Sequence, residues 1–306
     1  MISVIIPLYN KAPYIASTLQ CVLQQTYTHY EIVVVDDGST DDGVTKVKSV
    51  KDDRIRIVQQ KNGGVSAARN RGIAEACGEY VAFLDADDEW RPDYLQTQMD
   101  LVLKYPQCDV FASNYEFRNV EGKVTNTIIN KLPFEGTDGV LDNYFEVASC
   151  SHPPLWTSAV MVRKAAIQSI GGFPVGIKSG EDLLTWARLA VKYQIAYATA
   201  SLAVFVFDER AFNEDQRNRM PEQTDFVGEE LAKLQASYPN VQGLKQYVGV
   251  WHKMRARIFL SKHYRWKALH ECCQSIRYAL TVKIIVLMLL AFMPFSFVDF
   301  VFKKIR

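Results

Sequence analysis

The N-terminal part of the sequence alternates short apolar runs with segments in which apolar residues recur at helical spacing. A short apolar run bounded by turn residues predicts a buried strand, and helical spacing predicts an amphipathic helix. The predicted strands are residues 3–6, 31–35, 55–58 and 80–84, the first ended by Pro7, and the predicted helices are residues 13–25 and 66–76. Because strands apolar on both faces are typical of helix-covered parallel sheets, we expect an α/β fold with a mostly parallel sheet flanked by helices.

Polar residues follow three of these strands. The segments are PLYN after the first strand, DDGSTD after the second and LDADD after the fourth. Because ligands bind at the carboxyl ends of parallel strands, we expect the three loops to line one crevice. A dinucleotide-binding domain would need G-x-G-x-x-G after the first strand, and PLYN contains no glycine, which argues against that class.

The segment FLDADDEW places four carboxylates, Asp85, Asp87, Asp88 and Glu89, directly after a predicted buried strand. Such close like charges raise one another's pKa unless a metal ion, a basic side chain or water compensates them. A nucleotide diphosphate held by Mg²⁺ or Mn²⁺ would explain both acidic loops, because these ions take carboxylate and phosphate oxygens. The simpler alternatives are an Asp-Gly turn with a helix cap for DDGSTD and a solvated loop for LDADDEW. If the chain stays extended, Asp85 and Asp87 point to the same side.

Five segments in this order resemble a family-2 glycosyltransferase of the GT-A fold, of the bacterial surface-polysaccharide type. They are SVIIPLYN, VVVDDGSTD, NGGVSAARNRGI, YVAFLDADD and, further on, GGFP followed by GED and RL. The resemblance covers about residues 1–210. It implies an inverting enzyme that moves a sugar from a nucleoside diphosphate sugar, a UDP-sugar foremost, to a hydroxyl of an acceptor.

The resemblance implies roles for matching residues. LDAD matches the family's D-x-D motif, which implies that Asp87, assisted by Asp85, holds Mn²⁺ or Mg²⁺ on the diphosphate. DDG matches the segment that contacts base and ribose, and since neighbouring strand residues face opposite ways, only one of Asp36 and Asp37 is expected to reach the ligand. The other residues expected along the nucleotide sugar are Pro7, Tyr9, Asn10, Ala86 and Arg69, the last equally explained by a structural ion pair.

Glu181-Asp182 matches the family's E-D motif, in which the aspartate is the general base. A positioned carboxylate removes the acceptor hydroxyl's proton during attack, and direct displacement inverts the anomeric centre without a covalent nucleophile. Glu181 is expected to orient the site, although both carboxylates could instead only cap the helix that follows. On the acceptor side, Trp156 is a candidate for stacking on sugar, and His152 is expected to be structural.

The C-terminal part is basic and then apolar. Residues 251–283 hold eight Lys or Arg against one acid, Glu271, and the apolar stretch 284–302 is interrupted by Pro294 and Asp299. A helix or helical hairpin on the membrane surface, with basic residues on anionic lipid, is favoured. A true span and a soluble core helix are the alternatives. Attachment to the cytoplasmic face of the membrane would suit a lipid-linked oligosaccharide or polysaccharide acceptor.

Composition narrows the possible partners and cellular compartments. The net charge of +1 argues against a nucleic-acid partner, the N-terminus shows no signal peptide, and six cysteines without C-x-x-C spacing suggest reduced thiols. The expected division is residues 1–115 for the nucleotide sugar, 116–210 for acceptor and base, and 211–306 for a helical membrane-associating region. Two alternatives are a sugar nucleotidyltransferase, which should carry a Gly/Arg/Lys-rich first loop, and an inactive scaffold, which Asp85, Asp87 and Asp182 argue against.

Overall fold

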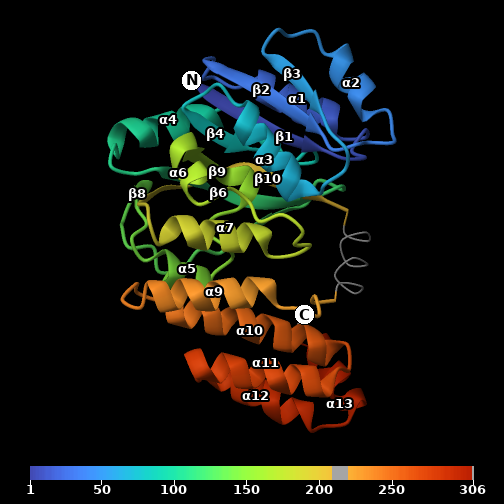
Figure 1. Ribbon diagram of the computed structural model, residues 1–306, viewed down its shortest axis with the longest axis vertical. Helices are drawn as coiled ribbons and strands as arrows, with labels where there is room; N and C mark the ends of the chain where they lie inside the picture. Colours follow the sequence, from blue (N-terminus) through green and yellow to red (C-terminus); the bar gives the residue numbers. More distant parts are fainter. Residues whose placement is uncertain (209–219, 305–306) are drawn as a thin grey trace. The chain divides into compact units, whose positions relative to one another are not determined.

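A computed structural model describes residues 1–208 and 220–304 of the chain. Contacts between residues divide the described part into two compact units (Figure 1). The first unit comprises residues 1–142 and 151–208, and the second comprises residues 143–150 and 220–304. The predicted three-part division stays a prediction, and its boundary at residue 210 lies outside the described residues.

A mixed sheet forms the centre of the first unit, with strand order β3-β2-β1-β4-β9-β6-β10-β5. The strands are β1 (Ile2–Leu8), β2 (Tyr30–Asp36), β3 (Ile55–Gln59), β4 (Tyr80–Phe83), β5 (Glu89–Trp90), β6 (Val110–Asn119), β7 (Val124–Asn126), β8 (Asp138–Val140), β9 (Val160–Arg163) and β10 (Ile195–Phe207). β3, β2, β1 and β4 run parallel, β9 is antiparallel to β4 and β6, and β6 is parallel to β10. The predicted α/β class is confirmed, and the half with the acidic loops is entirely parallel.

Helices cover both faces of the sheet. They are α1 (Ile15–Leu23), α2 (Gly43–Ser49), α3 (Val65–Glu75), α4 (Tyr94–Lys104), α6 (Lys164–Ser169) and α7 (Glu181–Ala190), with a 3₁₀ turn at η1 (Thr157–Ala159). Ile32 and Val34 of β2 pack in the core with α1 and α2, whereas Val33 and Val35 pack with Ala68 of α3. This alternation explains why the strand is apolar throughout.

Proline does not end the first strand. β1 continues through Pro7 to Leu8, and Pro7 is paired in register with Val35 of β2. On its other side β1 pairs with β4 only over residues 2–5, so at Pro7 the strand is an edge. A proline is tolerated there because no neighbour on that side requires its missing N–H. The predicted end at Pro7 was therefore wrong.

The second unit is helical. Its helices are α5 (Tyr144–Cys150), α9 (Phe226–Ser237), α10 (Leu244–Ser261), α11 (Arg265–Tyr278), α12 (Val282–Ala291) and α13 (Phe295–Lys304). A buried ion network joins three of them, since Arg255 Nε donates to Glu271 Oε1 at 2.8 Å and lies 3.2 Å from Asp225 Oδ2, while His252 Nδ1 lies 2.8 Å from Glu271 Oε2. Arg255 already pairs with both carboxylates, which disfavours a metal ion between them.

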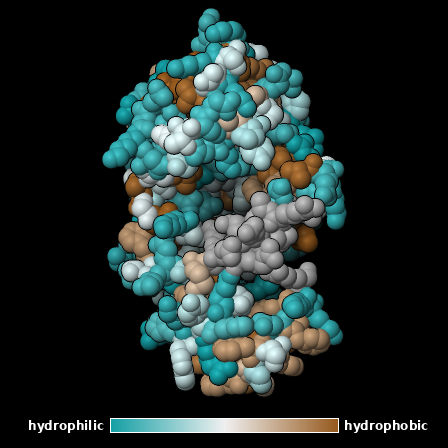
Figure 2. Space-filling view, turned by 90° about the vertical axis from the view of Figure 1, so that its right-hand side faces the viewer, coloured by the Kyte–Doolittle hydropathy of each residue, from teal (hydrophilic) through white to brown (hydrophobic). Residues whose placement is uncertain are grey.

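The apolar C-terminal stretch forms two short helices, α12 and α13, separated at Pro294. Ile284, Leu287 and Leu290 of α12 are buried in a core shared with α10 and α11. Other apolar side chains of α12 and α13 are exposed, and Figure 2 shows brown side chains in the lower part of the view. Among the described residues, none of the helices combines the length and apolar character needed to cross a bilayer.

Candidate active site

Three loops at the carboxyl ends of β1, β2 and β4 line one cleft of about 450 Å³. The lining residues are Pro7, Leu8, Tyr9, Lys11, Asp37, Asn62, Gly64, Val65, Ala68, Asp85, Ala86 and Asp87. The three strands are parallel neighbours, so their carboxyl ends meet at one edge of the sheet. The prediction that PLYN, DDGSTD and LDADD share a crevice is confirmed, and the start of α3 completes the cleft wall.

The structure separates Asp36 from Asp37, which the sequence left open. Asp37 lines the cleft, and its carboxylate accepts hydrogen bonds from the N–H groups of Gly63 at 2.9 Å and Gly64 at 2.8 Å. Asp36 is buried away from the cleft lining and accepts a hydrogen bond from Ser39 N–H at 3.0 Å. Of the two aspartates only Asp37 lines the cleft, where it also holds the loop before α3, and its contact with a ligand stays a prediction.

Asn10 ties the first loop to the second. Its φ of 51° is in the left-handed region that asparagine tolerates. Asn10 Oδ1 accepts a hydrogen bond from Thr40 N–H at 2.8 Å, and its own N–H donates to Ser39 Oγ at 3.2 Å. Pro7 and Tyr9 line the cleft, whereas Asn10 does not, and the ligand contacts of all three stay predictions.

Every carboxylate of FLDADDEW has a partner within the chain. The pairs are Asp85 with Arg69 at 2.8 Å, Asp87 with Lys11, Asp88 with Ser158 at 2.5 Å, and Glu89 with Arg118 at 2.5 Å. Basic side chains among the acids, one of the explanations considered from the sequence, are thus observed. Lys11 was not predicted from the sequence, although it directly follows PLYN, and neither were Ser158 and Arg118, which come from distant segments that carry no motif.

Asp88 holds the loop of residues 85–89 in place through Ser158. Its side chain is buried, and Ser158 Oγ donates a hydrogen bond to Asp88 Oδ2 at 2.5 Å while accepting one from Asp85 N–H at 3.1 Å. Burial, followed by the charges of Asp85 and Asp87, raises the pKa of Asp88 well above its usual value. Asp88 therefore fixes the loop that carries Asp85 and does not line the cleft.

The Asp85-Ala86-Asp87 segment is not extended, which corrects the expectation from strand alternation. β4 ends at Phe83, and Asp88 N–H donates to the carbonyl of Asp85 at 3.0 Å, so the chain turns. Asp85 and Asp87 nevertheless both line the cleft, and each has one carboxylate oxygen that accepts no hydrogen bond from a described residue. Two such oxygens fit a hard divalent cation, which commonly takes one or two carboxylates plus substrate phosphate.

Arg69 joins this loop to the start of α7. Its side chain is only 4% exposed, with Nη2 2.8 Å from Asp85 Oδ1 and Nη1 3.5 Å from Glu181 Oε1. Burial raises the pKa of Asp182, and the nearby Arg69 charge opposes that rise. Burial and then repulsion from Asp182 likewise raise the pKa of Glu181. Asp182 Oδ1 also accepts a hydrogen bond from Leu183 N–H at 2.8 Å in the first turn of α7, and the role of Asp182 as a base stays a prediction.

Trp156 and His152 lie in an aromatic group on β6 and β10. The Trp156 ring stacks on Tyr115 at 5.3 Å and packs edge-on against Phe205 at 5.1 Å. Protein side chains thus already occupy much of its surface, and acceptor contact by Trp156 stays a prediction. His152 Nδ1 accepts a hydrogen bond from Ile128 N–H at 3.0 Å, which agrees with the structural role expected for it.

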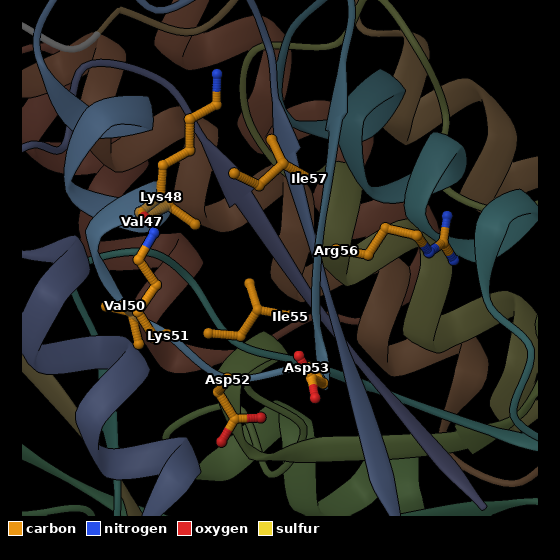
Figure 3. Close-up of a pocket in the computed structure, with 9 residues that line it drawn as sticks. All are labelled: Val47, Lys48, Val50, Lys51, Asp52, Asp53, Ile55, Arg56 and Ile57. Carbon is orange, nitrogen blue, oxygen red and sulfur yellow. Dashed lines mark hydrogen bonds between the residues drawn. The ribbon is translucent and has the colours of Figure 1, made fainter.

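A larger hollow of about 840 Å³ lies at the β3 edge of the sheet, away from these groups (Figure 3). Ile55 and Ile57 point toward α2, and Arg56 points away from it. Two of its charged groups are already paired, Asp52 with Arg54 at 2.7 Å and Arg56 with Glu75 at 2.9 Å. Size alone would therefore select a different hollow from the smaller cleft, which holds the residues of the predicted site.

Comparisons with known proteins point to one family. Residues 3–160, about half the chain, match the glycosyl transferase family 2 domain. A protein named uncharacterized glycosyltransferase from Rickettsia felis is 34% identical over 199 residues, covering 63% of this chain and 31% of that protein. The putative teichuronic acid biosynthesis glycosyltransferase TuaG of Bacillus subtilis is 32% identical over 201 residues, covering 64% of this chain and 75% of that protein. The chain thus matches about a third of the length of the first relative.

Solved structures share the fold. S. aureus TarS 1–349 in complex with UDP-GlcNAc has a TM-score of 0.63 at 19% identity and covers 94% of this chain and 83% of that chain. The mannosyltransferase PcManGT from Pyrobaculum calidifontis, in complex with GDP-Man and Mn²⁺, has a TM-score of 0.60 at 18% identity and covers 98% and 83%. At these identities the likeness establishes the architecture, a GT-A-like sheet with flanking helices.

Proposed function

The chain belongs to glycosyl transferase family 2, and from that premise we propose that it transfers a sugar from a nucleoside diphosphate sugar to an acceptor hydroxyl with inversion. The observation that carries this proposal is Arg69, because it links the carboxylate Asp85 of the nucleotide cleft to Glu181, the neighbour of the proposed base Asp182. One buried cation thus joins a donor site and a proton acceptor.

The donor half of the cleft suits a nucleoside diphosphate. We assign contact with base and ribose to Pro7, Tyr9 and Asp37, which line the cleft from β1 and β2. Lys11 lies beside Asp87 and places an ammonium group where a diphosphate would carry negative charge. A UDP-sugar is the foremost donor candidate, with support from the TarS complex, whose bound ligand is UDP-GlcNAc.

A divalent cation, Mn²⁺ or Mg²⁺, is part of the proposal. Asp85 and Asp87 would hold it through the carboxylate oxygens that Arg69 and Lys11 leave free. When bound, such an ion stabilises the negative charge that develops on a departing diphosphate. The structural neighbour with GDP-Man was solved with Mn²⁺, which supports the choice of ion.

Asp182 acts as the base in this proposal. The acceptor oxygen forms a bond to the anomeric carbon while its proton passes to the Asp182 carboxylate. The bond from that carbon to the diphosphate oxygen breaks, and its electron pair leaves with the nucleoside diphosphate. A raised pKa suits the task, because a carboxylate titrating closer to neutral pH binds the transferred proton more strongly.

We place the acceptor among lipid-linked oligosaccharides or polysaccharides, at the cytoplasmic face of a membrane. The relation to TuaG, named for teichuronic acid biosynthesis, and the exposed apolar side chains of α12 and α13 support this placement. The test is a panel of nucleotide sugars measured by thermal shift and by product formation, each with and without Mn²⁺. Absence of both stabilisation and turnover with every donor would favour an inactive relative.

A further inference from the structure

Two turns of the helical unit meet at one end of it. Arg265, at the start of α11, donates from Nη2 to the carbonyl of Met293 at 2.9 Å, in the turn between α12 and α13. The ring of His263 stacks on Phe295 with centroids 4.3 Å apart. A hollow of about 430 Å³ lies at this junction. Its lining residues are His263, Tyr264, Arg265, Trp266, Lys267 and Phe295.

The hollow is suited to an anion. Arg265 and Lys267 line it, and the first turn of α11 holds no acidic residue and no side-chain cap. Its backbone N–H groups therefore add to the positive potential at the helix start. Phosphate oxygens match this combination of guanidinium, ammonium and helix N-terminus.

The rim of the hollow is aromatic and apolar. Trp266 is 78% exposed and Tyr264 48% exposed on one turn, and Phe292 is 65% exposed on the other. Exposed apolar side chains continue along α12 at Val282 and Leu289. Trp and Tyr beside basic residues are typical of the headgroup level of a membrane. An exposed apolar surface of this kind marks an interaction site.

The excess of basic residues in this part of the chain favours an anionic lipid surface as the partner. From residue 262 to residue 304 the chain has seven Lys or Arg and two acids, Glu271 and Asp299. Both acids are already engaged, Glu271 by Arg255 and Asp299 by His263. A second copy of this face would oppose like charges, which costs binding energy, whereas anionic lipid attracts each basic side chain.

We propose that this end of the helical unit docks on an anionic phospholipid membrane, with a lipid phosphate in the hollow between His263 and Lys267. Trp266, Tyr264 and Phe292 then enter the boundary between headgroups and acyl chains. The proposal rests on the membrane attachment suggested above and is independent of glycosyl transfer itself.

The test is sedimentation of the full chain with vesicles of phosphatidylcholine alone or of equal parts phosphatidylcholine and phosphatidylglycerol. Lys267→Glu changes two charge units, and at about 1 kcal/mol per charge we expect partitioning onto anionic vesicles to fall about 30-fold. Trp266→Ser should weaken binding about tenfold through lost apolar contact. Lys245→Glu is the matched control, because Lys245 is exposed at the other end of α10, about 25 Å along the helix from Lys262.

Three outcomes would overturn the proposal. They are equal vesicle binding by Lys267→Glu and Lys245→Glu, equal binding to both vesicle types, and thermal stabilisation by inorganic phosphate without vesicle binding, which would indicate a free-phosphate site. Circular dichroism of each variant excludes misfolding as the cause. Hydrolysis of the nucleotide sugar without membranes should be unchanged by Lys267→Glu, so failure of this proposal is distinguishable from failure of the proposed function.

Discussion

Replacing Arg69 by methionine tests the link between the donor cleft and the base. Arg69 contacts Asp85 and Glu181, and its side chain is 4% exposed. Burial lowers the pKa of the guanidinium, but the combined attraction of Asp85, Glu181 and Asp182 outweighs burial and raises that pKa, so the group stays charged. Methionine keeps the apolar stem and removes the charge. The expected change therefore reflects charge more than packing.

The effect of Arg69→Met on the pH dependence follows from the pKa of Asp182. Burial raises the pKa of Asp182 and Arg69 opposes it, so removal of Arg69 raises that pKa further. Because a base must be deprotonated to act, the acidic limb of kcat/KM should move to higher pH. Breaking the buried pair should also cost about 3 kcal/mol of stability.

The assay is nucleotide sugar turnover as a function of pH, together with urea denaturation. Arg56→Met is the matched control, because Arg56 lies 2.9 Å from Glu75 and 3.5 Å from Glu31 but at the sheet edge. The Arg56→Met variant should lose stability while the acidic limb of its kcat/KM profile stays in place. Arg69→Lys should keep the limb near its wild-type position. An unmoved limb in Arg69→Met, or equal movement in Arg56→Met, would refute the coupling.

Three further predictions concern single carboxylates. Asp182→Asn should lower transfer about 10²–10⁴-fold with little change in the Kd of the nucleotide sugar measured by calorimetry, and wild-type turnover would disprove the base assignment. Asp87→Ala should weaken Mn²⁺-dependent nucleotide binding about tenfold relative to the exposed control Asp100→Ala, and equal affinities would contradict a metal role. Burial raises the pKa of Asp88, so the folded state binds its proton more tightly than the unfolded state and stability is lost as pH rises. The Asp88→Asn variant should therefore be more stable than wild type near neutral pH by about 1 kcal/mol, and this gain should disappear in acid. Urea denaturation at both pH values measures the difference, and equal stabilities near neutral pH would contradict the prediction.

The strands and their loops could be predicted because they depend on local pattern. EIVVV is apolar on both faces, and both faces are covered in the structure. The shared cleft then follows from parallel pairing of β1 with β2 and β4. The family motifs assigned Asp85, Asp87 and Asp182 to one reaction before any geometry was known, and in the structure all three belong to the first unit.

The features that could not be predicted from the sequence depend on contacts between distant segments. Ser158 reaches Asp88 across seventy positions, and no local pattern marks a serine as the partner of a buried acid. The choice between Asp36 and Asp37 required the position of Gly63 and Gly64, whose N–H groups bind only Asp37. Pro7 was misjudged because its tolerance depends on where the neighbouring strand β4 ends.

The charges around Arg69 favour the proposed divalent ion over another basic side chain. Four carboxylates meet two cations there. The carboxylates are Asp85, Asp87, Glu181 and Asp182, and the cations are Lys11 and Arg69. When all are ionised, two negative charges are uncompensated, and together with burial they raise the pKa of Glu181 and Asp182. One more ammonium group would offset half of that charge, whereas a divalent cation offsets all of it and still accepts phosphate oxygens.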